Sequence, residues 1–143
     1  KNIRDKAKLE GDVNLKIAEE FLEKNKKNKV EIKETPTGLQ YKVLKEGTGV
    51  SPNSTDKVRV HYVGKLLDGS VFDSSIERGE PSEFGLNQVI KGWTEGLQLM
   101  KIGGKYEFFI HPKIAYGSRP RPNIPANSLL IFEVELLDIL TKK

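Results

Sequence analysis

The sequence has no cysteine and only two histidines among its 143 residues. The missing thiols exclude disulfides, thiolate nucleophiles and cysteine-based zinc sites, and they are compatible with both the cytoplasm and the periplasm. No apolar run approaches the roughly 18 residues that a membrane helix needs, so we expect no membrane span. The chain does not begin with Met and shows no signal pattern. We therefore expect a processed or trimmed chain from which any export signal is already gone.

The motifs of ordinary catalysis are also missing. The sequence contains no Gly-x-Ser-x-Gly elbow, no phosphate-binding glycine loop and no cluster of metal-ligating residue types. We therefore expect no metal and no cofactor. Side chains alternate between the two faces of a strand. His61 and His111 fall on outward-facing positions of their expected strands, next to the inward-facing Tyr62 and Ile110. For both histidines we favour a surface position over a catalytic role.

The positive charge is concentrated at one end of the chain. The net charge is +4, and residues 1–33 hold 10 Lys and Arg against 7 Asp and Glu. A basic arm of this kind can indicate a nucleic-acid partner. A solvated helix surface is the simpler explanation, and we favour it over nucleic-acid binding.

Residues 1–29 have the pattern of a long helix. They contain no proline and a single glycine, Gly11, which costs about 1 kcal/mol relative to alanine in a helix. The cationic run 24–29 suits the negative end of the helix dipole. The apolar stripe must be buried against the chain's own domain, or the helix must act as a connector or dimerisation arm, and both interpretations stay open. The stripe consists of Ile3, Ala7, Leu15, Ala18 and Leu22.

From residue 35 the pattern changes to short strands separated by turns. Period-two alternation predicts strands at 39–43, 57–62, 106–110 and 130–136, with a further strand starting at 71–72. The one helical candidate is 92–100, which segment 101–104 should end. This order predicts an α+β fold: an antiparallel β-sheet wrapped around one short helix, preceded by a long N-terminal helix. We divide the chain into a helical arm, residues 1–33, and a domain, residues 34–143.

Several aromatic residues occupy the inward-facing positions of these expected elements. By themselves they indicate an ordinary hydrophobic core rather than a site. They are Tyr62, Phe72, Trp93, Tyr116 and Phe132.

Several longer motifs point to a particular family. Segments 60–75 (VHYVGKLLDGSVFDSS), 89–97 (VIKGWTEGL), 114–117 (IAYG), 124–125 (IP) and 130–136 (LIFEVEL) closely resemble the FKBP family of macrolide-binding peptidyl-prolyl isomerases. They occur in family order and at roughly family spacing across residues 38–140. A helix followed by Thr-x-x-Gly-Leu-Gln-Tyr at 35–41 is similar to the bacterial Mip/FkpA/FklB-like subgroup. In that subgroup an N-terminal helical region dimerises two chains.

The resemblance implies a binding pocket with assigned roles. It makes Trp93 the floor and places the Tyr116 hydroxyl at the lip as a donor. It leaves the Ile90 N–H available to a substrate carbonyl. The implied catalytic residues are Tyr62, Phe72, Asp73, Tyr116 and Phe132, and the implied substrate-binding residues are Val89, Ile90, Trp93, Ile124, Arg78 and Phe84.

Asp73 has two interpretations within this resemblance. Paired with Arg78 and a tyrosine hydroxyl, it holds those groups in place, and we favour this structural role. As a contributor to the field at the reacting carbonyl, it is catalytic. Ser82 stands where some eukaryotic members have an aromatic residue, and segment 118–123 carries two arginines and is slightly shorter than in those members. Both departures bear on substrate preference and macrolide affinity.

The resemblance implies a folding enzyme that isomerises X–Pro bonds by non-covalent stabilisation of a twisted amide. Its expected partners are proline-containing polypeptides and macrolides of the tacrolimus and rapamycin type, and the full-length form is expected to be a homodimer. The expected location is the periplasm or the bacterial cell envelope, with the cytoplasm as the alternative. The alternative function is a chaperone or peptide-binding module whose isomerase activity is weak or secondary.

Overall fold

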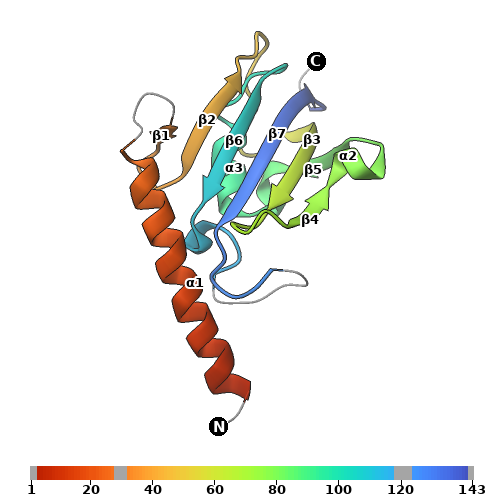
Figure 1. Ribbon diagram of the computed structural model, residues 1–143. Helices are drawn as coiled ribbons and strands as arrows, with labels where there is room; N and C mark the ends of the chain where they lie inside the picture. Colours follow the sequence, from red (N-terminus) through yellow and green to blue (C-terminus); the bar gives the residue numbers. More distant parts are fainter. Residues whose placement is uncertain (1–2, 28–31, 118–123, 142–143) are drawn as a thin grey trace.

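The computed structural model describes residues 3–27, 32–117 and 124–141, and only the backbone of residues 3–10. A long helix leads into a curved sheet that encloses one short helix (Figure 1). The elements in chain order are α1 (Ile3–Asn25), β1 (Ile32–Glu34), β2 (Gln40–Lys45), β3 (Lys57–Lys65), β4 (Val71–Ser74), α2 (Ser75–Arg78), β5 (Ser82–Gly85), η1 (Leu86–Gln88), α3 (Lys91–Leu97), β6 (Lys105–Ile110), η2 (Pro112–Ile114) and β7 (Leu130–Ile139).

Within the described residues all strand pairings are antiparallel and form one sheet of seven strands. The strand order is β1-β2-β6-β7-β3-β4, and β5 pairs with the first half of β3. The period-two alternation decides which face is buried: Val58, Val60 and Tyr62 of β3 point into the core. The predicted α+β class and the sheet wrapped on a short helix are confirmed by this arrangement.

Helix α3 packs on the inner face of the sheet through two glycines. A Cβ at Gly92 would lie 2.7 Å from Ile110, and one at Gly96 would lie 2.7 Å from the Phe108 ring. These positions therefore require glycine, because any side chain would push the helix away from β6. The close approach offsets the poor helix propensity of glycine.

The short helix ends earlier than the sequence predicts. The prediction was 92–100, whereas α3 spans Lys91–Leu97. After Leu97 the chain tightens into turns, because Leu99 and Met100 donate to carbonyls three residues back, at 3.0 and 3.2 Å. The predicted helix stop at 101–104 is a separate turn leading into β6, in which Gly103 takes a φ of 91°.

Helix α1 lies against the outer face of the sheet (Figure 1). Ala18 and Leu22 are buried with Phe109 and Leu129, and Phe21 packs against the same cluster. Packing on the chain's own domain, one of the two open interpretations, is therefore observed. The same contact explains why Phe109 is buried although Phe108 and Ile110 face the opposite core. The side chains of Ile3 and Ala7 lie outside the described part.

The end of α1 is fastened to the sheet by a buried side chain. Gln40 Nε2 donates to the Leu22 carbonyl at 2.8 Å and to Glu34 Oε2 at 3.1 Å. The boundary that we drew between residues 33 and 34 falls inside β1, which pairs with β2. Among the described helices none is both long enough and apolar enough to cross a bilayer.

Candidate functional site

The inner face of the sheet and the start of α3 enclose an open cavity of about 710 Å³. This size is within the range of about 300–1,000 Å³ that small-molecule and peptide side-chain sites occupy. Seven separate segments of the chain meet there. The lining residues are Tyr62, Phe72, Asp73, Phe84, Gln88, Val89, Ile90, Trp93, Ala115, Tyr116, Ile124 and Phe132.

Trp93 is surrounded by three aromatic rings that stand nearly perpendicular to it. The ring centroids of Tyr62, Phe84 and Phe132 lie 5.2, 5.4 and 5.1 Å from that of Trp93, at interplanar angles of 87°, 84° and 86°. Such edge-to-face contacts join the positive edge of one ring to the negative face of another. The indole Nε1 is buried and has no hydrogen-bond partner among the described residues. Ring packing therefore holds the flat indole in place.

Phe72 and Phe132 form a second edge-to-face pair, 5.4 Å apart at 89°. Gly64 of β3 makes room for this pair, since a Cβ there would lie 2.7 Å from both rings. The register places Gly64 opposite Phe132 on one side and Asp73 on the other. A register shift at Gly64 and Lys65 follows. Irregularities of this kind re-aim side chains, and here the consecutive residues Phe72 and Asp73 both reach the cavity.

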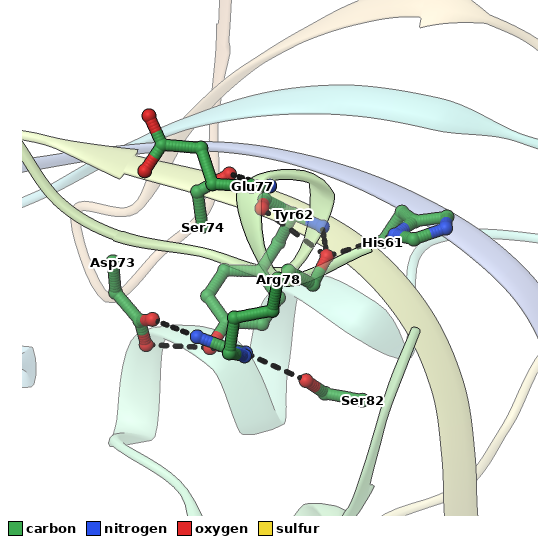
Figure 2. A network of polar contacts seen from close by, with 8 residues as sticks. His61, Tyr62, Asp73, Ser74, Glu77, Arg78 and Ser82 are labelled. Carbon is green, nitrogen blue, oxygen red and sulfur yellow. Dashed lines mark hydrogen bonds and ion pairs between the residues drawn. The ribbon is translucent and has the colours of Figure 1, made fainter. Parts of the chain in front are cut away.

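A polar network holds Tyr62 and Asp73, two of the lining residues (Figure 2). The Tyr62 hydroxyl donates to Asp73 Oδ2 at 2.5 Å, and Arg78 Nη1 donates to the other carboxylate oxygen. Arg78 Nη2 also donates to the Tyr62 hydroxyl at 3.0 Å and to Ser82 Oγ at 2.9 Å. Asp73 is thus held from two sides, and the tyrosine ring is fixed in its orientation.

The electrostatics of the network keep Asp73 ionised and Tyr62 protonated. Burial raises the pKa of Asp73, but the hydrogen bonds from Tyr62 and Arg78 outweigh it, so the net pKa is lowered. Burial, followed by the hydrogen bond to Asp73, raises the pKa of Tyr62. The hydrogen bonds to Tyr62 and Asp73 raise the pKa of Arg78, which stays charged. None of these groups is tuned toward neutral pH.

The single turn α2 positions Arg78. Ser74 caps it by accepting from the Glu77 N–H at 3.2 Å, and Gly79 ends it with a φ of 81°. The neighbouring Ser75 is buried, and its Oγ accepts from the Tyr62 N–H at 2.8 Å and lies 2.9 Å from His61 Nδ1. The Ser74 hydroxyl thus caps the turn, and the Ser75 hydroxyl fastens it to β3.

The corner between η1 and α3 contributes Val89 and Ile90 to the lining of the cavity. The Ile90 carbonyl accepts from the N–H groups of Trp93 and Thr94, and Thr94 Oγ1 donates to the Leu86 carbonyl at 2.5 Å. These bonds fix the segment that carries Val89 and Ile90. Tyr116 and Ile124 also line the cavity, and the side chain of Ile124 is buried.

The structure brings ten of the eleven sequence-predicted site residues to this cavity. Arg78 does not line it and instead binds Asp73 and Tyr62 from behind. Sequence reasoning missed Gln88 and Ala115, each a direct neighbour of a predicted residue, and Gly64, whose role depends on a close approach that no local pattern reveals. The arginines of segment 118–123 lie outside the described residues.

Neither histidine lines the cavity. His61 contacts Ser75, and His111 is half-buried rather than a free surface residue. Its Nδ1 accepts from the Lys113 N–H at 2.9 Å, and its Nε2 lies 3.3 Å from Glu19 of α1. Both histidines are partly exposed, at the outward-facing positions that the sequence predicts, and each also takes part in a specific contact.

Two family models match the chain. Residues 49–137 match the model described as FKBP-type peptidyl-prolyl cis-trans isomerase, and residues 1–43 match the model described as the domain amino terminal to it. The first match alone covers more than half of the sequence. It contains all the lining residues of the cavity.

Curated proteins and solved structures agree with these matches. The chain is 55% identical over 136 residues to the FKBP-type isomerase FkpA of Aeromonas hydrophila, covering 94% of this chain and 50% of that protein. It is 54% identical over 121 residues to the FKBP-type 22 kDa isomerase of Escherichia coli, covering 84% and 58%. The crystal structure of FkpA from Escherichia coli superposes with a TM-score of 0.91 at 46% identity, covering 95% and 63%. The chain thus spans about half the length of its curated relatives.

Proposed function

The chain belongs to the family of FKBP-type peptidyl-prolyl cis-trans isomerases, and on that premise we propose that it accelerates rotation about X–Pro bonds in polypeptide clients. The observation that carries the proposal is the buried Trp93, which lines the cavity and stands nearly perpendicular to the rings of Tyr62, Phe84 and Phe132. The pyrrolidine ring of proline is a compact, apolar group that can pack on such an aromatic surface.

The chemistry to be accelerated needs no nucleophile. The peptide bond resists rotation with a barrier of about 18–20 kcal/mol because the amide is conjugated. The cis and trans forms of an X–Pro bond are close in energy, so this barrier alone makes exchange slow. At the top of the barrier the amide is twisted, has lost conjugation and is less polar than the planar form.

An apolar cavity therefore favours the twisted amide over the planar one. This is catalysis by differential binding of the transition state, without a covalent intermediate. In our proposal Trp93 receives the proline ring, and Tyr62, Phe72 and Phe132 present ring edges to the twisting carbonyl. The Tyr116 hydroxyl and the Ile90 N–H hold the neighbouring backbone while the bond turns.

For Asp73 we propose the structural role. Its carboxylate is engaged by Tyr62 and Arg78, and these contacts support a group that orients the wall rather than one that acts on the substrate. Phe84, Val89 and Ile124 complete the surface around the bound proline. Arg78 contributes through Tyr62 and Asp73.

A protease-coupled assay on a short X–Pro peptide tests the proposal. We expect the full chain to accelerate exchange and Phe132→Leu to lower kcat/KM by at least about tenfold, the effect expected when transition-state contacts are lost. Tyr106→Leu is the matched control, because Tyr106 is a similarly buried strand aromatic outside the cavity. A wild-type rate equal to the uncatalysed rate would overturn the proposal.

A chaperone or peptide-binding role is the second candidate. A further groove of about 470 Å³ runs beside α3, lined in part by Leu99 and Ile114, and Leu99 is exposed. Apolar surface of this kind can hold an unfolded segment. The double variant Tyr116→Phe with Phe132→Ala should then suppress aggregation of an unfolded client as well as wild type does. Loss of that protection would refute a role independent of the cavity.

The remaining partner proposals follow from family membership. We propose that the cavity binds tacrolimus- or rapamycin-type macrolides. Titration with such a macrolide should change Trp93 fluorescence, and no change at saturating rapamycin would refute this proposal.

We propose that the full-length form is a homodimer through its N-terminal region, which the second family match supports. A monomer by sedimentation would refute that.

The relatives are bacterial, and we propose a site of action in the periplasm or cell envelope. Cell fractionation that recovers the full-length protein only in the cytoplasm would refute this location.

A further inference from the structure

Two asparagines join α1 to the segment that carries the cavity residue Ile124. Asn14 of α1 donates through Nδ2 to the Ala126 carbonyl at 3.0 Å. Asn127 donates in the opposite direction, through its own Nδ2 to the Gly11 carbonyl at 3.1 Å. Gly11 is buried at this contact. In Figure 1, α1 passes beside the start of the chain that leads into β7. The two bonds make a reciprocal clamp between the arm and the domain.

The clamp continues from Asn127 to the lip of the cavity. The backbone N–H of Asn127 donates to the Gly117 carbonyl at 2.8 Å, and the Gly117 N–H donates to the Pro112 carbonyl at 2.8 Å. Gly117 directly follows Tyr116, which lines the cavity. Hydrogen bonds therefore link α1 to Ala126 and Asn127 and then to Gly117. Gly117 is the direct neighbour of Tyr116, and Ala126 is two residues from Ile124, so the bonds end close to both residues of the lip.

The backbone of Asn127 shows that this position is specialised. Its φ of 56° lies in the left-handed region, and among the described residues it is the one non-glycine position with positive φ. Asparagine tolerates this conformation better than most residues. Its side chain, at the same time, holds α1. A single residue thus combines the turn before β7 with the attachment of the arm.

We propose that α1 positions the substrate cavity, with Asn14 and Asn127 as positioning residues that act through Ile124 and Tyr116. This inference rests on the proposed isomerase function of that cavity. When the clamp is closed, segment 124–127 holds the Ile124 side chain against the cavity. When α1 lifts, the Ala126 carbonyl and the Asn127 amide lose their partners, and both sides of the lip relax. By thermodynamic linkage, a bound peptide then favours the packed position of α1 by the same factor by which the packed α1 favours peptide binding.

Two substitutions remove the clamp without disturbing the backbone. Asn127→Gly deletes the side-chain amide and retains a residue that accepts positive φ. Asn14→Ala deletes the other donor and favours the helix. Lys16→Ala is the matched control, because Lys16 is exposed on the same helix. Each Asn variant should raise the Kd of a short X–Pro peptide about two- to tenfold, the effect of one net hydrogen bond, and Lys16→Ala should leave this Kd unchanged.

Hydrogen exchange supplies a measurement that a merely structural role would not change. In wild type and Lys16→Ala, adding the X–Pro peptide should slow amide exchange in α1 around residues 11–18. In the two Asn variants this protection should disappear. Unchanged Kd values in both folded Asn variants, or no peptide-dependent protection of α1 in wild type, would overturn the inference.

A failure of the proposed function gives a different result. Wild type would then neither bind the peptide nor accelerate its exchange. In that case the NMR signals of the Ile124 methyl and the Tyr116 amide decide the positioning: they should shift in both Asn variants and stay unchanged in Lys16→Ala. Unshifted signals in the Asn variants would refute the positioning itself.

Discussion

Gly64 shows how much one missing side chain decides in this cavity. Its position between Phe132 and Asp73 in the sheet places the backbone directly under the Phe72–Phe132 pair. A methyl group there would lie 2.7 Å from both rings. The walls of the cavity can meet edge to face only because this residue has no Cβ.

Gly64→Ala should therefore both destabilise the protein and damage the cavity. Overpacking of this kind costs about 1–3 kcal/mol of unfolding free energy, measured by urea unfolding. Because the two rings must separate, kcat/KM should also fall, and an X–Pro peptide assay measures it. Gly69→Ala is the control, since it strains a turn with a φ of 89° outside the cavity. It should cost stability and leave kcat/KM unchanged; full activity in Gly64→Ala would contradict this account.

Asp73 makes a testable contribution to acid stability. Its pKa is lowered relative to the ordinary value of 3.8, burial being outweighed by the bonds from Tyr62 and Arg78. A carboxyl with a lowered folded-state pKa stabilises the fold above its unfolded-state pKa, and this contribution is lost as the pH falls through the folded-state pKa. Asp73→Asn should thus have a lower urea midpoint than wild type at pH 7, and the difference should shrink between about pH 5 and pH 2.

The control for this prediction is Glu80→Gln, an exposed acidic residue that does not line the cavity. Its urea midpoint should follow that of wild type at every pH. A constant difference between Asp73→Asn and wild type down to pH 2 would show that the substitution acts through packing rather than through charge.

The sequence predicts that Tyr62, Trp93 and Phe132 face inward, because alternation along a strand and spacing along a helix are properties of a short stretch of sequence. Their convergence on one cavity could not be predicted in this way, since β3, α3 and β7 are brought together only by the sheet order. The family motifs supplied that information. The same motifs led us to expect that Arg78 pairs with Asp73 and Tyr62, and the hydrogen bonds of Arg78 to both residues fit this expectation.

At the scale of elements, the long strands were predictable and the short elements were not. Strands β3 and β7 carry nine and ten residues of alternating burial, enough to define a period. Helix α2 and strand β5 have four residues each, which is too few. Their geometry depends on the Ser74 cap and on pairing with β3. The position of α1 depends on burial of Phe109, which a strand pattern cannot anticipate.

Helix α1 should be fastened through Leu22 rather than through its exposed apolar residues. Leu22 is 7% exposed in the cluster with Phe109, whereas Val13 on the same helix is 57% exposed. Leu22→Ala should cost about 2 kcal/mol of unfolding free energy, the lower end for a buried leucine. Val13→Ala should stay within about 0.5 kcal/mol of wild type.

Urea unfolding followed by circular dichroism measures both values. Trp93 fluorescence in the same samples reports the cavity. Equal losses in the two variants would mean that the buried cluster does not hold the helix.

At the scale of the whole molecule, Asp73 is the one charged side chain among the described lining residues of the cavity, and it is engaged by Tyr62 and Arg78. The described lining of the cavity is largely aromatic and aliphatic, and both histidines lie outside it. The pKa of Asp73 is lowered and that of Tyr62 is raised, so neither group changes charge near neutral pH. This distribution fits catalysis by shape and low polarity and does not fit proton transfer.

The isomerase rate should therefore be independent of pH and of solvent deuterium. We expect kcat/KM to be flat between about pH 6 and pH 9, because no general acid or base with a pKa in that range takes part. The solvent isotope effect should be close to 1. Exchange NMR on an isotope-labelled X–Pro peptide measures both without an auxiliary protease whose own pH dependence would interfere. A bell-shaped profile or a clear isotope effect would mean that a proton moves in the transition state, and the cavity would then need a catalytic group beyond the aromatic walls.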